Sequence, residues 1–242
     1  MSRYDDPPRL EQEPPSTAPE DPGGGRLGAR PHDPTVPPDA PGLHELGLDG
    51  RRDGLLYVPA GYRPDNPTPL VVMLHGAGGN ARGGIEPFLP LADDAGLLLV
   101  APQSRAPTWD VIGSSFGADV AFIDRVLSHV FDRFAVDPSR LALEGFSDGA
   151  SYALSLGLSN GDLFTHLIAF SPGFCAPSYP VDSPKIFITH GTEDRVLRID
   201  RTSRILWPRL EGTGYDVVYD EFRGGHTVPA EEAKRAVDWF LH

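Results

Sequence analysis

Ser147 lies at the centre of the pentapeptide GFSDG (residues 145–149), which fits the pattern G-x-S-x-G. The apolar run LALEG leads into it and a stretch with helical character follows it. The serine is therefore expected on a sharp strand-to-helix turn that exposes its hydroxyl group. Glycines are needed two residues before and after it, because a Cβ there would collide with the neighbouring strand or helix. The predicted role is that of a nucleophile, and an ordinary turn with an exposed serine is the alternative.

A serine hydroxyl is a poor nucleophile at neutral pH and needs a base within hydrogen-bond reach, itself oriented by a carboxylate. In chains with this kind of turn the order is serine, acid, histidine, and several histidines follow Ser147. His166 begins a strand and so lies at the wrong edge of a sheet, His190 ends a strand and orders the turn next to it, and His242 is the last residue. His226, in the loop GGHTVP, is the predicted base.

The predicted acid is Asp194, which follows the apolar run KIFIT within the segment HGTED. That place is just beyond the carboxyl end of a strand, where the acid is expected. Glu193 and Asp200 remain alternatives, whereas Asp182 precedes its strand and is set aside.

Two segments offer backbone N–H groups for a developing oxyanion. The loop HGAGGN (residues 75–80) follows the apolar run LVVML, and its glycines let the chain approach the nucleophile. We assign one donor to the amide of Ala77, with Gly78 as the alternative. The other is the amide of Asp148 at the start of a helix, whose dipole favours negative charge, and the Asp148 side chain is expected to cap that helix. A phosphate-binding loop is disfavoured because G-x-x-x-x-G-K-[ST] is absent.

Short apolar runs and helical stretches alternate along the chain. The predicted strands are 43–48, 54–58, 70–74, 97–101, 141–145, 166–170, 185–189 and 215–222, and the predicted helices are 118–134, 148–158, 200–211 and 230–241. Near-continuous apolar runs indicate strands covered on both faces. The alternation predicts an α/β fold with a doubly wound, mostly parallel sheet and helices on both faces. The short connection between residues 170 and 185 leaves no room for a large lid.

Residues 1–41 differ in composition from the rest of the chain. They hold 11 of the 26 prolines, a run of three glycines and few large apolar residues. Such a segment buries too little apolar surface to offset its ordering entropy, so we expect a disordered or extended Pro-rich tail there. Residues 42–242 are expected to form a single catalytic domain.

The net charge of −13 argues against nucleic acid as a partner, because binding a polyanion requires clustered Lys and Arg, and against an anionic membrane surface. The N-terminus lacks the apolar core of a secretory signal, and no segment reaches the ~20 apolar residues that span a bilayer. The single cysteine, Cys175, can form no intrachain disulfide. We expect a cytoplasmic protein that acts on a small molecule; its oligomeric state is left open.

Five segments together resemble the α/β-hydrolase superfamily. They are LHGAGGN (74–80), DPSRLALEGFSDGAS (137–151), FSPGF (170–174), HGTEDRV (190–196) and GGHTVP (224–229). Over about residues 43–242 the chain is similar to the small carboxylesterase/phospholipase type and to the group of polyhydroxybutyrate-depolymerase-like and feruloyl-esterase-like proteins.

This resemblance implies hydrolysis of carboxylic esters through an acyl-enzyme, without a metal or cofactor. Ser147 would attack, His226 would move the proton and Asp194 would orient the imidazole, while the amides of Ala77 and Asp148 would receive the oxyanion. Secreted members of the group usually carry export signals and cysteine pairs, which this sequence lacks. A polymeric or plant-wall substrate is therefore disfavoured.

Without a large lid, the predicted site is open and suits short-chain, water-soluble esters. Its walls are expected from five aromatic residues, with plain core packing as the alternative for each: Trp109, Phe116, Phe146, Phe174 and Tyr179. A serine peptidase or amidase and a thioesterase would use the same triad and remain alternatives. A noncatalytic binding protein on the same fold is a further alternative.

Overall fold

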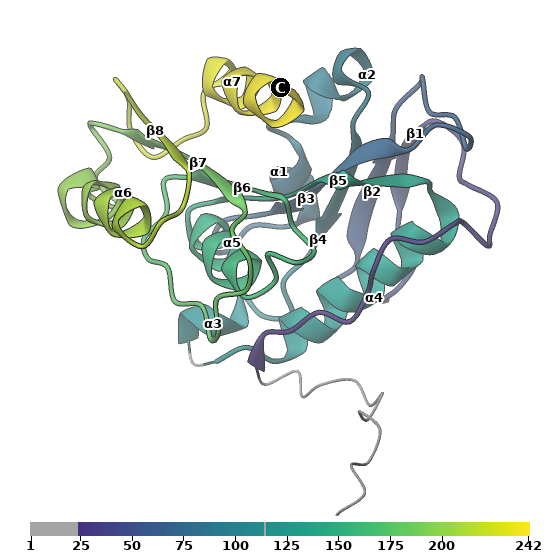
Figure 1. Cartoon of the computed structure of the whole chain (residues 1–242), viewed down its shortest axis with the longest axis horizontal. Helices are drawn as coiled ribbons and strands as arrows, with labels where there is room; N and C mark the ends of the chain where they lie inside the picture. Colours follow the sequence, from purple (N-terminus) through teal and green to yellow (C-terminus); the bar gives the residue numbers. More distant parts are fainter. Residues whose placement is uncertain (1–23, 114) are drawn as a thin grey trace, which may run out of the picture.

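Residues 24–113 and 115–242 are described by the computed structural model (Figure 1). Within them, eight strands form one sheet in the order β1-β2-β4-β3-β5-β6-β7-β8. The strands are β1 (Gly42–Glu45), β2 (Gly54–Val58), β3 (Thr68–Leu74), β4 (Leu98–Pro102), β5 (Val136–Phe146), β6 (His166–Phe170), β7 (Lys185–Gly191) and β8 (Val217–Phe222). β2 pairs antiparallel with β1 and β4, and all other neighbours are parallel. The predicted mostly parallel sheet is confirmed.

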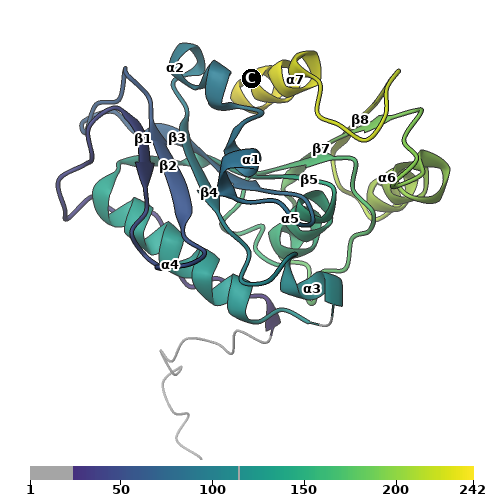
Figure 2. The ribbon, with the colours of Figure 1, turned by 180° about the vertical axis from the view of Figure 1, so that it is seen from behind.

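Helices cover both faces of the sheet, as Figures 1 and 2 show from opposite sides. One face is packed by α1 (Ala81–Ile85), α2 (Ala92–Ala95) and α7 (Ala230–Leu241). The other is packed by α4 (Ala118–Arg133), α5 (Asp148–Leu158) and α6 (Ser203–Gly212), and the short α3 (Asp110–Gly113) lies against α5. Two 3₁₀ turns, Leu89–Leu91 and Ile199–Arg201, complete the described elements. The doubly wound architecture follows from these two layers.

The boundaries of several elements differ from the prediction for local reasons. β1 ends at Glu45, before the predicted residue 48, because the Asp53 carboxylate accepts hydrogen bonds from the amides of Gly47 and Leu48 and turns the chain there. α6 begins three residues after the predicted start, since the chain first forms a 3₁₀ turn over Ile199–Arg201. β5 begins at Val136, which pairs with Thr68 of β3, so this strand starts five residues before the predicted residue 141.

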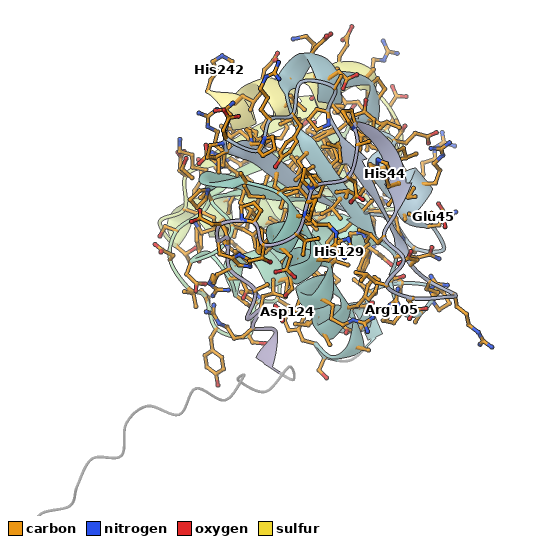
Figure 3. All side chains as sticks on the ribbon, turned by 90° about the vertical axis from the view of Figure 1, so that its right-hand side faces the viewer. His44, Glu45, Arg105, Asp124, His129 and His242 are labelled. Carbon is orange, nitrogen blue, oxygen red and sulfur yellow. The ribbon has the colours of Figure 1, made fainter. Side chains whose placement is uncertain are left out.

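Residues 24–41 are packed against the body, so the expectation of a tail is wrong for this part of it. The segment runs along α4 (Figure 1), where the carboxylate of Asp124, labelled in Figure 3, accepts hydrogen bonds from the amides of Gly28 and Ala29. Leu27 is 3% exposed, and its amide donates to the buried side chain of Asn160. Specific side-chain acceptors therefore hold a segment whose own composition is poor in apolar residues. Residues 1–23 lie outside the described residues.

In the described part of the chain, no helix is both long and apolar enough to cross a bilayer.

Candidate active site

Ser147 lies on the turn between β5 and α5, with the backbone angles φ 59° and ψ −119°. This conformation is strained for a residue with a side chain, and such strain is typical of a nucleophile turn. The turn is tight on both sides. A Cβ added at Gly145 would lie 2.2 Å from the carbonyl oxygen of Gly149, and one at Gly149 would lie 2.2 Å from that of Leu74. The glycines of the pentapeptide are therefore required by the close approach of β3, β5 and α5.

The imidazole of His226 reaches the hydroxyl group of Ser147. Its Nε2 lies 2.8 Å from Ser147 Oγ, and its Nδ1 lies 2.6 Å from Asp194 Oδ2. The ring of Phe146 lies beside the imidazole, at 4.6 Å between centroids. The loop between β8 and α7 carries His226, and it comes so close to β7 that a Cβ at Gly191 would lie 2.4 Å from the Gly224 and Gly225 carbonyl oxygens. The structure thus brings together the serine, histidine and acid that the sequence singled out.

Asp194 lies in the turn after β7, and its side chain is fully buried. Oδ1 accepts hydrogen bonds from the amides of Val196 and Leu197, and Oδ2 accepts from His226 and, at 3.1 Å, from His190 Nε2. Burial raises the pKa of the Asp194 carboxyl, but the hydrogen bonds from His226, Leu197 and Val196 outweigh it and keep the pKa below its usual value. Asp194 is therefore a fixed, ionised partner for the imidazole.

The alternative acids lie outside this arrangement. Glu193 is exposed and pairs with Arg223, and Asp200 pairs with Arg198 at the surface. Asp182 is exposed and precedes β7.

His190 also contacts the acid, Asp194. The sequence predicted only that His190 orders the adjacent turn. Its side chain is fully buried; Nε2 lies 2.7 Å from the carbonyl oxygen of Leu197, and Nδ1 lies 2.7 Å from Ser203 Oγ. Burial lowers the pKa of His190, so the ring is neutral. Nε2–H then donates to Leu197 and Asp194, while Nδ1 accepts from the Ser203 hydroxyl. A short hydrogen-bonded chain therefore runs from Ser203 to Ser147.

The amides expected to bind an oxyanion are free to do so. Within the described residues, neither the amide of Ala77 nor that of Asp148 donates to another group. The amide of Gly78, the alternative to Ala77, donates to Pro107 O at 2.7 Å and is therefore occupied. The carboxylate of Asp148 does not cap α5 as expected. It accepts a hydrogen bond from Thr108 Oγ1 at 2.8 Å instead.

Of the five aromatic residues expected as walls of the site, Trp109 and Phe116 belong to the core. Trp109 is 1% exposed, donates from Nε1 to His75 O and stacks on Tyr152, which Phe116 also contacts. Burial under α5 thus outweighs the loop position that suggested a wall, and the expectation is wrong for these two. Phe146 does line a cavity beside His226.

The other two aromatic residues, Phe174 and Tyr179, lie on the segment between β6 and β7. Phe174 is half-buried, and Tyr179 is 77% exposed. Neither lines the cavity beside His226.

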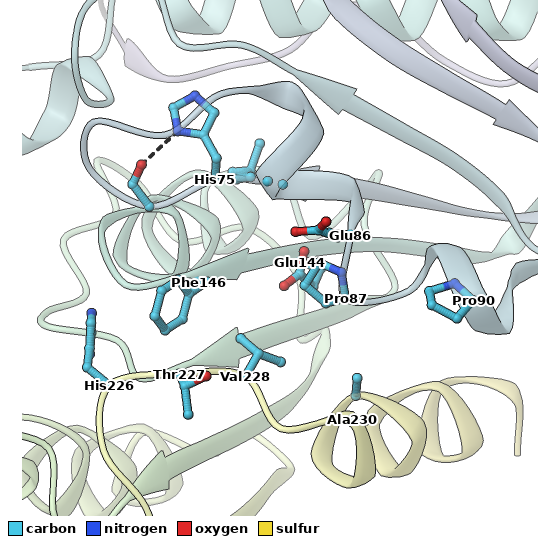
Figure 4. A pocket seen from close by; sticks show the side chains of 15 residues that line it. His75, Glu86, Pro87, Pro90, Glu144, Phe146, His226, Thr227, Val228 and Ala230 are labelled. Carbon is cyan, nitrogen blue, oxygen red and sulfur yellow. Dashed lines mark hydrogen bonds between the residues drawn. The ribbon is translucent and has the colours of Figure 1, made fainter.

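This cavity, of about 360 Å³, lies between β5, α1 and the start of α7 (Figure 4). Its lining includes Gly76, Phe146 and His226 from the proposed catalytic region, and also Glu144. Glu144 is not among the residues predicted from the sequence. The available signal was a single charged residue inside the apolar run LALEG.

In residues 24–113 and 115–242, no group of three or more His, Cys, Asp or Glu side chains converges as a metal site would.

Comparisons with known proteins identify the family of this chain. Residues 47–218 match the family model described as "Putative esterase". The chain is 30% identical over 167 residues to "Probable feruloyl esterase C" of Aspergillus oryzae, covering 66% of this chain and 60% of that protein. The chain thus spans about 60% of the length of the curated relatives that it matches.

Two solved structures illustrate the similarity of fold. Esterase PE8 has a TM-score of 0.62 at 23% identity, over 76% of this chain and 95% of that chain. The S-formylglutathione hydrolase FrmB of Staphylococcus aureus has a TM-score of 0.67 at 17% identity, over 86% of this chain and all of that one. Both share the arrangement of strands and helices described above.

Proposed function

The chain belongs to the esterase family, and from this premise we propose that it is a serine hydrolase that cleaves carboxylic esters through an acyl-enzyme. The observation that carries the proposal is the continuous set of hydrogen bonds from Ser147 through His226 to Asp194. It combines a nucleophile, a general base and a group that fixes the base in one place.

The acylation step uses these three side chains in turn. Ser147 Oγ attacks the ester carbonyl carbon while its proton moves to Nε2 of His226. The positive charge that forms on the imidazole is stabilised by Asp194, which holds the proton on Nδ1. The tetrahedral intermediate then collapses, the bond to the alcohol oxygen breaks, and that oxygen takes the proton from His226. A water molecule repeats the sequence on the acyl-enzyme and releases the acid.

The developing oxyanion is stabilised by the amides of Ala77 and Asp148. Both are free of other partners in the described residues, and the amide of Asp148 also lies at the N-terminus of α5, where the helix dipole favours negative charge. Loss of one such donor typically lowers the rate ~10²–10³-fold. The negative charge of the Asp148 carboxylate would destabilise an oxyanion nearby. The hydrogen bond from Thr108 Oγ1 fixes the orientation of this carboxylate.

We expect short-chain, water-soluble esters as substrates. The segment between β6 and β7 contains no helix in the described structure, so nothing there forms a large lid over Ser147. The similarity to proteins named feruloyl esterase adds esters of aromatic acids as candidates.

The test is a substrate panel on the full chain beside its Ser147→Ala variant. The panel contains p-nitrophenyl acetate and palmitate, methyl ferulate, a thioester and an anilide of the same acetyl group. The acetate ester is expected to be cleaved fastest among these, and Ser147→Ala is expected to lower kcat by about 10⁴–10⁶. A clear preference for palmitate would contradict the short-chain assignment. A preference for the thioester or the anilide would replace ester hydrolysis by one of the alternative reactions.

A further inference from the structure

Glu144 is a buried carboxyl group with no hydrogen-bond partner among the described residues. It lies on β5, with Met73 of β3 and Ile168 of β6 as its neighbours in register, and it faces the layer formed by α1 and α7. Its residue is 1% exposed, and in the described part of the chain neither Oε1 nor Oε2 makes a hydrogen bond. An apolar residue at this place would fit the surrounding core better, because a buried polar group without a partner destabilises the fold.

The side chain of Glu144 borders a cavity, although its two carboxyl oxygens are themselves covered in the free protein. Glu144 lines the cavity of about 360 Å³ beside His226. Figure 4 shows its side chain together with those of Phe146, Pro87 and Val228, which supply apolar surface. Exposed residues such as Pro90 and Ala230 also line the cavity, which therefore opens to solvent. A buried polar group that borders an open, mostly apolar cavity is an arrangement by which proteins orient small ligands.

The charges around the cavity select the kind of ligand. No lysine or arginine lines it among the described residues, whereas Glu86 adds a second carboxyl group from the turn after α1. Of the other titratable groups, His75 is held by Gly76 O and the amide of Ser104, and burial lowers its pKa, so it carries no charge. His226 is hydrogen-bonded to the serine and the acid described above. The net charge of −13 further raises the local concentration of cations.

The buried charged group of α7 is engaged elsewhere. Glu232 is buried and accepts hydrogen bonds from Thr189 and Arg235. It therefore offers no partner to Glu144.

We propose that this cavity binds a small organic cation, a primary ammonium group on a short apolar body, and that Glu144 is the group that recognises the ammonium. The ammonium group donates hydrogen bonds to the Glu144 carboxylate, and the apolar body lies against Phe146, Pro87 and Val228. Because Gly76 and His226 line the same cavity, the preferred esters of this enzyme carry an ammonium group. This last statement rests on the proposed function, whereas the binding itself does not.

Binding changes the protonation of Glu144. Burial raises the pKa of its carboxyl group well above the usual value, which favours the protonated form in the free protein. The ammonium ligand stabilises the carboxylate form, and the proton of Glu144 is released to solvent as the complex forms. Affinity therefore rises with pH until Glu144 ionises in the free protein or the ammonium group loses its own proton.

The experiment measures binding by titration calorimetry. It uses the full chain with the substitution Ser147→Ala, so that the outcome does not depend on turnover. The probes are benzylammonium and benzyl alcohol, which share an apolar body and differ in charge. At pH 8, benzylammonium is expected to bind on the order of ten- to a hundredfold more tightly, as a hydrogen bond to a charged group allows. Titrations in buffers of different protonation enthalpy are expected to show proton release.

Three further variants in the same background identify the group responsible. Glu144→Gln and Glu144→Met are expected to remove the preference for benzylammonium. Glu193→Gln, an exposed glutamate outside the cavity, is expected to keep it. The Met variant is included because it fills the same core position with an apolar side chain and keeps the fold if Gln does not.

The proposal is overturned if neither probe binds, if both bind equally, or if the Glu144 variants keep the preference. If benzylammonium binds as expected but no ester is cleaved by the wild type, the binding site stands and the proposed function fails. If esters are cleaved but those with an ammonium group show no advantage over neutral esters of equal size, the link between cavity and substrate fails.

Discussion

Two buried carboxyl groups near His226 have opposite surroundings. Asp194 follows β7 and accepts hydrogen bonds from two backbone amides and two imidazoles. Glu144, on β5, shares a cavity with His226 and makes no hydrogen bond within the described residues. Partners keep the pKa of the first carboxyl low, and their absence leaves the pKa of the second high. Satisfied hydrogen bonds, rather than burial alone, thus decide whether a buried acid is an ionised anchor or a neutral group open to a ligand.

Replacement of Asp194 is expected to have the largest effect on activity. Asp194→Asn is expected to lower kcat about 10⁴-fold, because the amide favours the wrong imidazole tautomer and cannot stabilise the charged ring. Steady-state hydrolysis of p-nitrophenyl acetate measures the change. Glu193→Gln is the matched control, since it alters the adjacent, exposed carboxylate, and it is expected to retain wild-type turnover. Equal losses in both variants would contradict the assignment of the acid.

His190 provides an intermediate test, since it acts on the reaction only through Asp194. His190→Leu removes the hydrogen bonds to Asp194 and Leu197 and is expected to lower kcat about tenfold, the cost of one hydrogen bond to a charged group. KM is expected to change little, because His190 contacts Asp194 and not the ester. His190→Gln keeps an amide donor and is expected to restore part of the lost kcat. An unchanged kcat in His190→Leu would leave only a structural role.

Removal of the unsatisfied carboxyl group is expected to stabilise the protein. Glu144→Met is expected to raise the free energy of unfolding by about 1–3 kcal/mol at neutral pH, since a buried group without partners carries its full desolvation penalty. Urea denaturation measures the difference. A destabilised Glu144→Met variant would mean that Glu144 has a structural partner and would erase the contrast with Asp194.

The two carboxyl groups should also differ in how they link stability to pH. The folded-state pKa of Glu144 is raised, so above the pKa of the unfolded chain, ~4.3, stability falls as pH rises toward the folded value. The advantage of Glu144→Met should therefore be larger at pH 8 than at pH 5, by no more than about 1.4 kcal/mol per pH unit in this range. The folded-state pKa of Asp194 is lowered, so its contribution is present above ~3.9 and is lost as pH falls through the folded value.

The fold class and the convergence of Ser147, Asp194 and His226 could both be predicted from the sequence. Apolar runs with a G-x-S-x-G turn constrain the backbone so tightly that the positions of Ser147 and Asp194 follow from their place at strand ends. The loop that carries His226 then folds back to the same edge of the sheet. All of these features can be recognised from short sequence motifs and from the spacing of apolar residues.

The surroundings of the site depend on contacts between distant segments, which the sequence pattern does not reveal. Trp109 follows a strand as a wall residue would, yet α5 covers it. Residues 24–41 are poor in apolar side chains, yet Asp124 and Asn160 bind their backbone. The proposed role of Glu144 depends on the absence of a hydrogen-bond partner among its described neighbours. That absence is visible only in the folded structure, where β3, β6, α1 and α7 surround the side chain.

The most direct test of the account is the site of reaction with a fluorophosphonate. Mass spectrometry of the wild-type chain is expected to show a single phosphonyl adduct, located at Ser147 by peptide mapping. The adduct should be absent in Ser147→Ala and should form far more slowly in Asp194→Asn. Absence of labelling in the folded wild-type protein, or an adduct on another residue, would contradict the proposed nucleophile and the mechanism built on it.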